Sequence, residues 1–206
     1  MRLTSLREFM KPGEHRFRLP MAATALSIFW TIGATDGRLA RVISILLVMS
    51  AVLLTLHAAE MMRSSRHVAG ALIVSSAAMS TLGTAIDNAI WVRGLGQLIA
   101  AVPIVWAAVM VVRWISRREV ITFEAVVAGI LVYMLVAMAF ADLYGAIADL
   151  AHDPLFCTQG DGTASDRAYF SLVTITTTGY GDFTSCMRIG RAIAVCEAVF
   201  GQIYLV

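Results

Sequence analysis

The sequence predicts an all-α integral membrane protein with six transmembrane helices. Of its 206 residues, 59% are hydrophobic and only 15% are charged, which is too apolar for an ordinary soluble domain. Several apolar runs are long enough to cross about 30 Å of hydrocarbon, which takes about 20 residues of helix. The net charge of +2 excludes little by itself, and three cysteines do not make a disulfide framework.

Six apolar runs follow one another along the chain, and we expect each to be a span. They are 19–35, 39–59, 68–86, 89–115, 123–148 and 192–206. The first has no clear small-residue cleavage site and further spans follow it, so a cleaved signal peptide is not expected. The third is rich in small residues, which let helix backbones approach closely in lipid.

The basic residues near the ends of the spans indicate the orientation. Basic residues collect on the cytoplasmic side of membrane proteins. With the N-terminus in the cytoplasm, ten lie inside and six outside, so we expect this orientation. The inner ones are Arg2, Arg7, Lys11, Arg16, Arg18, Arg63, Arg66, Arg113, Arg117 and Arg118; the outer ones are Arg38, Arg41, Arg93, Arg167, Arg188 and Arg191.

One segment near the C-terminus departs from the helical pattern. It reads Thr174-Ile175-Thr176-Thr177-Thr178-Gly179-Tyr180-Gly181-Asp182. Glycines that alternate with larger residues let successive carbonyls point the same way, because glycine tolerates backbone conformations that other residues avoid. Gly-Tyr-Gly-Asp alone could be a surface turn. An apolar run with helix-start residues Ser165 and Asp166 precedes it and the run 192–206 follows, and this order argues against a simple turn.

This segment resembles the selectivity filter of potassium channels, in which rings of backbone carbonyls replace the water around a dehydrated ion. The resemblance covers 123–206 and is most specific over 169–201. It implies a channel that conducts K⁺ passively across the lipid bilayer. It also implies a homotetramer, because non-helical backbone at membrane depth must be surrounded and one chain supplies only one filter strand.

The resemblance also implies the roles of individual residues. The carbonyls of the filter and the Thr177 hydroxyl would bind K⁺, the Tyr180 ring would pack outward, and Asp182 would lie at the outer mouth. The filter residues are Thr177, Thr178, Gly179, Tyr180 and Gly181. K⁺ is expected as the permeant ion, with no cofactor, no catalytic residue and no nucleic-acid partner. No nucleophile–base arrangement or phosphate loop supports an enzyme.

The chain departs from the common filter pattern at three places. Thr178 stands where valine is commonest, and β-branching is retained. The loop 183–186 lacks the proline that many members carry after the filter. Some members have a glutamate in the pore helix that pairs with the filter aspartate; Val173 stands there, so Asp182 needs another partner.

Two residues of the last span are candidates for a role in the pore. Gly201 lies where the family has a flexible glycine, so it is either a gating hinge or a packing glycine. Glu197 is costly in a membrane and usually marks a partner or a wet surface. We expect it to support the pore by a hydrogen bond to the back of the pore helix rather than to line the pore.

Two domains are expected. Residues 1–118 form a cytoplasmic N-terminal segment and a four-helix transmembrane domain, and 119–206 form the pore domain of outer helix, pore helix, filter and inner helix. This multi-pass protein would lie in the cell membrane with its N-terminus cytoplasmic, which places the filter outside. The final run, 192–206, would span only about 22 Å at 1.5 Å per residue, so we expect a longer protein that continues past Val206.

Other polar residues suggest little further chemistry. Arg93 and Arg113 end the fourth span with no arginine between them, so they are expected to reach the interfaces and not to sense voltage. His57 and Glu60 share a helix face but are expected to be solvated, because the metalloprotease pattern is absent. Free thiols are expected at Cys157 and Cys186, with a disulfide as the alternative.

Two alternatives to a selective channel remain. One is a non-selective cation channel with the same architecture. The other is a potassium transporter subunit, whose family carries four pore-loop repeats in one chain, usually with a single glycine in each filter. One repeat with an intact Gly-Tyr-Gly favours the channel.

Overall fold

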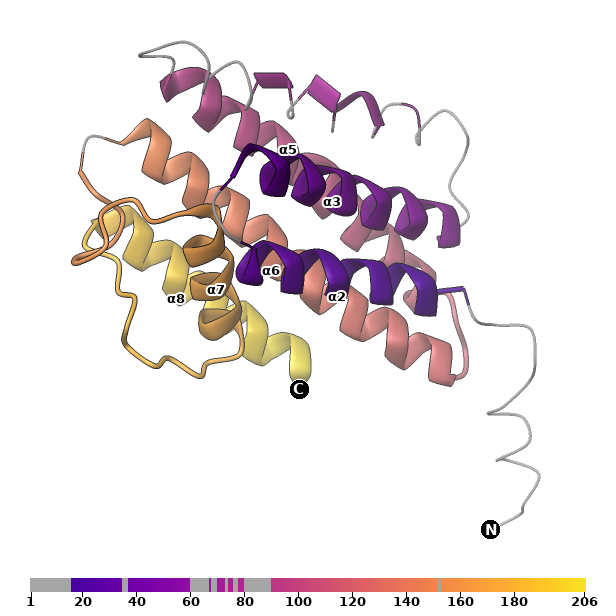
Figure 1. Cartoon of the computed structure of the whole chain (residues 1–206). Coiled ribbons are helices and arrows are strands. Elements are labelled where there is room, and N and C mark those ends of the chain that lie inside the picture. Colours follow the sequence, from indigo (N-terminus) through magenta and orange to yellow (C-terminus); the bar gives the residue numbers. More distant parts are fainter. Residues whose placement is uncertain are drawn as a thin grey trace.

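Figure 1 shows the computed structural model of the chain. It describes residues 16–34, 37–59, 90–151 and 153–206, together with 67, 70–72, 74–75 and 78–79. Over this part of the chain the regular elements are all α-helices, with only isolated bridges outside them. The helices are α2 (Arg18–Gly33), α3 (Arg38–Ala58), α5 (Ile90–Ser116), α6 (Phe123–Leu150), α7 (Ala164–Ile175) and α8 (Arg188–Leu205). Most of the third expected span lies outside the described residues.

The last helix is longer than the sequence pattern predicted. The helix α8 begins at Arg188 and runs for 18 residues, because the backbone N–H of Arg191 already donates to the Met187 carbonyl at 3.0 Å. Arg188, Gly190 and Arg191 hid this first turn from a pattern based on apolar residues. The expected start at 192 is therefore wrong, and α8 is about 27 Å long at 1.5 Å per residue.

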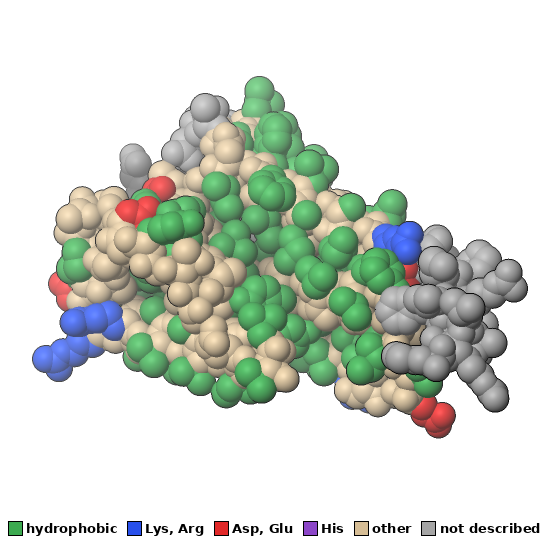
Figure 2. All heavy atoms as spheres, turned by 90° about the horizontal axis from the view of Figure 1, so that it is seen from below, with side chains coloured by type: hydrophobic (Ala, Val, Ile, Leu, Met, Phe, Trp, Pro, Cys, Tyr) green, Lys and Arg blue, Asp and Glu red, His purple; other side chains and the backbone are tan. Residues whose placement is uncertain are grey.

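Two helices are long and apolar enough to cross a membrane over the described ranges, namely Trp91–Ser116 and Phe123–Leu150. A shorter apolar stretch covers Val42–Ala58. Figure 2 shows hydrophobic side chains spread over the middle of one face, with charged side chains toward its two ends. A soluble monomer rarely exposes so extensive an apolar surface, whereas lipid or a neighbouring subunit covers one in a membrane protein.

The helix α6 lies at the centre of the molecule and positions the C-terminal elements. It packs along α5 of the same chain, since only a short turn joins them, and it also contacts α2, α7 and α8 (Figure 1). Leu131 and Leu135 of α6 are fully buried against this core, as are Leu56 of α3 and Val111 of α5. The helices α7 and α8 thus pack on a helical core that includes α6.

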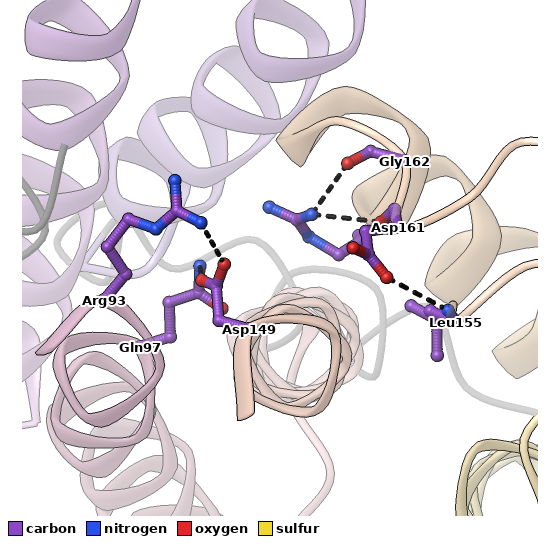
Figure 3. Close-up of polar contacts among 7 residues, drawn as sticks. Arg93, Gln97, Asp149, Leu155, Asp161 and Gly162 are labelled. Atoms are coloured by element: carbon purple, nitrogen blue, oxygen red, sulfur yellow. Dashed lines mark hydrogen bonds and ion pairs between the residues drawn. The ribbon is translucent and has the colours of Figure 1, made fainter. Parts of the chain in front are cut away.

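Charged residues fix both ends of α6 to the N-terminal helices. At one end the Glu124 carboxylate accepts a 3.2 Å hydrogen bond from the Phe17 backbone N–H and pairs with Arg18 at 3.4 Å. At the other end Asp149 pairs with Arg93 of α5 at 3.0 Å and accepts a 2.9 Å hydrogen bond from Gln97 (Figure 3). No pattern in the sequence indicated a partner for Arg93, because Arg93 and Asp149 lie far apart along the chain.

Candidate functional site

The helix α7, which corresponds to the expected pore helix, begins with a capping box. The Thr163 hydroxyl accepts from the Asp166 backbone N–H at 3.2 Å, and the Asp166 carboxylate accepts from the Thr163 N–H at 2.8 Å. This reciprocal pair satisfies two of the amides that a helix start leaves without partners. Ser165 then donates to the Ile32 carbonyl of α2 at 2.8 Å, and Arg167 donates to the carbonyls of Asp161 and Gly162 (Figure 3). The start of α7 is therefore held from several sides.

The backbone after α7 folds back on the end of that helix. The N–H groups of Thr177 and Thr178 donate to the carbonyls of Thr174 and Val173 at 2.9 and 3.0 Å, and the Gly179 N–H donates to Val173 at 3.3 Å. No described peptide bond is cis. In a trans peptide the carbonyl points opposite to the N–H that follows it. The carbonyls that precede these three amides therefore point away from α7, toward the exposed side of the segment.

The backbone conformation alternates along the same segment. The φ angles of Thr177, Gly179 and Gly181 are +54°, +55° and +83°, whereas Thr178 and Tyr180 have negative φ. Such alternation turns successive amides to one side and the carbonyls to the other. Thr177 is the one non-glycine residue with positive φ in the described part of the chain. A β-branched residue rarely adopts this conformation, and such strain is concentrated at functional sites.

The sequence pattern indicated the two glycines but not the positive φ at Thr177. Gly179 and Gly181 are two residues apart. The same spacing continued toward the N-terminus leads to Thr177 and would have indicated a positive φ there. A Cβ built at Gly179 would meet no atom of the same chain within 4 Å. The requirement for glycine there is therefore conformational within one chain and does not come from crowding.

Asp182 has a partner on the pore helix. Its carboxylate accepts a 2.9 Å hydrogen bond from the Tyr169 hydroxyl and a 3.1 Å bond from the Phe183 backbone N–H. Gln159 of the preceding loop donates to the Asp182 carbonyl at 2.7 Å. The bond to Asp182 raises the pKa of the Tyr169 phenol. Tyr169 thus supplies the hydrogen-bond partner for Asp182 that the apolar Val173 cannot supply. The sequence pattern did not indicate Tyr169. The neighbouring Tyr180 side chain is 72% exposed in the single chain.

A disulfide joins the loops on the two sides of α7 and the filter segment. Cys157 is bonded to Cys186, with Cα atoms 4.9 Å apart. Two backbone hydrogen bonds accompany it, from the Cys157 N–H to the Thr184 carbonyl at 3.1 Å and from the Cys186 N–H to the Leu155 carbonyl at 3.0 Å. The expectation of free thiols is wrong for this pair and the alternative holds. Cys196 is free and exposed.

A row of aromatic rings connects the surroundings of Asp182 to the interior. Neighbouring rings contact edge to face, with centroids 5.0–5.7 Å apart. Such pairs are stabilising beyond the area they bury. In order the rings belong to Tyr169, Phe183, Phe156, Phe170 and Tyr144.

Glu197 lies at the inner end of this row, fully buried between α6, α7 and α8. Its carboxyl group accepts from the Tyr144 hydroxyl at 2.7 Å and is bonded to the Ser171 hydroxyl of α7. The Ser171 hydroxyl also lies 2.7 Å from the Ala137 carbonyl of α6. The hydrogen bond expected between Glu197 and the back of the pore helix is present, while its importance for the pore stays a prediction.

Gly201 lies where α8 passes close to the end of α7. A Cβ there would collide with the carbonyl oxygen of Ile175, the last residue of α7. The same carbonyl accepts a 2.6 Å hydrogen bond from the Tyr133 hydroxyl of α6. Close packing against Ile175 therefore explains why a glycine is needed at position 201. A hinge at Gly201 stays a prediction.

The remaining candidates add no second site. His57 is exposed at the end of α3, and Glu60 lies outside the described residues. Among the residues that the structure describes, no three His, Cys, Asp or Glu side chains are grouped to hold a metal ion.

Comparison with known families identifies the C-terminal part. Residues 120–206 match the family model described as ion channel. This part of the chain belongs to the ion channel family. No curated protein and no solved structure matches the chain.

The ion channel segment contains α6, α7, the filter segment and α8. Together with the two membrane-length helices, it makes the chain a membrane protein that transports ions. Ion channels in general catalyse no reaction; they provide a path along which ions move. The exposed carbonyls after α7 are the groups in this segment that can replace the hydration shell of a cation.

Proposed function

We propose that the chain is one subunit of a homotetrameric potassium channel in the cell membrane. The observation that carries the proposal is the set of three successive amides that fold back on α7. Because these amides face the helix, the carbonyls of Thr176, Thr177 and Thr178 face the opposite side. There the Thr176 carbonyl accepts from the Thr177 hydroxyl, and the carbonyls of Thr177 and Thr178 can bind a cation. The alternating φ angles extend the same arrangement through Gly181.

The tetramer is supported by the exposure of the filter. Residues Thr176 to Asp182 are all exposed in the single chain. Non-helical backbone at membrane depth is tolerated only where protein surrounds it or where it lines a wet path. Four copies around an axis would meet this requirement, stack the carbonyls of Thr177, Thr178, Gly179, Tyr180 and Gly181 as rings, and cover the exposed Tyr180 ring.

The orientation is supported by two features. The distribution of basic residues favours a cytoplasmic N-terminus. With six spans, this orientation puts the filter at the outer side. The Cys157–Cys186 disulfide lies beside the filter, and disulfides persist in oxidising surroundings outside the cytoplasm. Both features support a position for Asp182 at the outer mouth.

Ion flux into liposomes tests the function. We expect the purified chain to carry K⁺ and to carry Na⁺ much less, with reversal potentials in mixed solutions that follow the K⁺ gradient. Equal permeability would establish the non-selective alternative, and the absence of any flux would refute the channel. Native mass spectrometry tests the assembly, and a monomer in lipid would contradict the tetramer.

Gly179→Ala tests the filter directly, and Gly160→Ala is its matched control. Both glycines have positive φ, +55° and +66°, and a Cβ at either meets no atom of the chain within 4 Å. The conformational cost is therefore similar, of order 1–2 kcal/mol. We expect Gly179→Ala to lose conduction or selectivity and Gly160→Ala, in the outer loop, to retain both. If the two variants have the same conduction and selectivity, the assignment of the segment around Gly179 as the filter is wrong.

A further inference from the structure

The helix α8 contacts the base of the filter through Gln202. Its side-chain Nε2 donates a hydrogen bond of 2.9 Å to Oγ1 of Thr177, the first filter residue. Both side chains are exposed in the single chain, on the side where the carbonyls of the segment point. Thr177 also has the strained positive φ noted above, so the contact is made to a residue whose backbone is held in an uncommon conformation.

The hydrogen-bond inventory of Thr177 fixes the direction of this contact. The Thr177 hydroxyl donates its one proton to the Thr176 carbonyl at 2.7 Å. A hydroxyl has one proton and two acceptor lone pairs. Oγ1 must therefore act as the acceptor toward Gln202, which identifies the amide nitrogen as the donor. One lone pair of Oγ1 is occupied by Gln202 and a single lone pair is left for a cation.

The position of α8 holds the amide at this distance. Gly201 packs against the Ile175 carbonyl so closely that a Cβ would collide with it. Two residues beyond Gln202, the Tyr204 hydroxyl donates to the Gly129 carbonyl of α6 at 2.8 Å. Gly201 thus packs on α7 and Tyr204 is bonded to α6, on the two sides of Gln202. Helix packing therefore sets the distance between the Gln202 amide and Thr177.

We propose that Gln202 is a positioning residue that weakens cation binding at the innermost site of the filter. This inference rests on the proposed channel function. The amide removes one lone pair of Thr177 Oγ1 from the ion and turns the positive end of its own dipole toward the site. Both effects lower the affinity of that site for a cation. An ion that binds less tightly leaves more readily, and conduction requires binding that is weak enough to allow exit.

Barium block applied from the cytoplasmic side tests the proposal in planar bilayers that contain the whole chain. Gln202→Met keeps the length of the side chain but has no donor. Gln202→Asn keeps the amide but is one methylene too short to reach Oγ1. Because a single hydrogen bond contributes about 0.5–1.5 kcal/mol, we expect both variants to lower the barium dissociation constant roughly threefold to tenfold. Ile203→Met, at an exposed neighbouring position of α8, should leave it unchanged.

The outcomes separate the inference from the function on which it rests. If wild type conducts and is blocked but Gln202→Met has the same dissociation constant, the inference is wrong and the channel stands. If Gln202→Met differs while Gln202→Asn behaves as wild type, cavity polarity acts in place of the hydrogen bond, and the inference is again overturned. If wild type carries no K⁺ current, both proposals are wrong.

Discussion

The Tyr169 hydroxyl donates a 2.9 Å hydrogen bond to the Asp182 carboxylate and so joins the pore helix to the residue that follows the filter. Phe183, next to Asp182, packs edge to face on the same tyrosine ring, with centroids 5.7 Å apart. Asp182 and Phe183 are therefore both held by the Tyr169 side chain, one by a hydrogen bond and the other by ring packing.

Tyr169→Phe should destabilise the open filter while leaving the fold intact. The variant keeps the ring and its packing on Phe183 but removes the hydrogen bond to Asp182. We expect more frequent closures in single-channel recordings at constant voltage. Asp182→Asn is the matched control, because its amide oxygen still accepts from Tyr169 although the charge is gone. If channels with Asp182→Asn close as often as channels with Tyr169→Phe, the filter depends on the charge of Asp182 and not on its hydrogen bond to Tyr169.

Removal of the disulfide should destabilise the protein around the pore loop. The bridge closes a loop with a sequence separation of 29. A bridge over a loop of this size stabilises a protein by about 3–4 kcal/mol in the chain-entropy model. We expect Cys157→Ser, or a reductant, to lower the temperature of thermal unfolding, and Cys196→Ser to have no effect. Peptide mapping without reduction checks the bond, and free thiols at Cys157 and Cys186 would contradict it.

Glu197 should tolerate an amide but not an apolar side chain. In Glu197→Gln the amide oxygen can accept from Tyr144, and its nitrogen can donate to Ser171, which then donates to the Ala137 carbonyl. Glu197→Leu leaves the buried Tyr144 and Ser171 hydroxyls without this partner, at a cost of about 1–3 kcal/mol for each unsatisfied group.

Thermal unfolding in detergent compares the two Glu197 variants. We expect Glu197→Gln to unfold close to wild type and Glu197→Leu clearly lower. Tyr144→Phe combined with Glu197→Leu should lose less than the sum of the single losses, because one unsatisfied hydroxyl is removed. If Glu197→Gln and Glu197→Leu lower the unfolding temperature equally, the negative charge of Glu197 itself is required.

The helices and the glycines with positive φ could be predicted from local patterns, whereas most contacts of the candidate site could not. Hydrophobic runs predicted the regions of α5 and α6, and Gly179 and Gly181 marked the positions of positive φ. The partners of Asp182 and Arg93 depend on how separate helices pack, so no local pattern indicates them. The first turn of α8 was missed because an arginine begins it.

The same physical limit applies to Gln202 and Thr177. They lie 25 residues apart, and only the close approach of α8 at Gly201 brings them together. A glutamine in an apolar run is a visible exception and could have been flagged as a polar group in need of a partner. Which partner it has depends on the position of α8 against the filter.

Opening should depend only weakly on voltage. The helix α5 carries Arg93 near its start and Arg113 in its last turn, with no basic residue between them. Arg93 is held by Asp149 at 3.0 Å, so moving it inward would break an ion pair and leave a carboxylate alone. Each charge moved across the membrane contributes about 2.3 kcal/mol per 100 mV, and steep gating needs several charges in each subunit.

The conductance–voltage curve of wild type and of Asp149→Asn tests this directly. Asp149→Asn frees Arg93 from its carboxylate but keeps an oxygen that can accept from Gln97. We expect shallow curves for both proteins, since a single arginine per subunit supplies too little charge, together with a loss of stability of up to about 1 kcal/mol for this partly exposed pair. A wild-type curve that requires several charges per subunit would contradict the prediction. A curve that steepens only in Asp149→Asn would instead show that the ion pair restrains a mobile charge, because the variant differs from wild type in little else.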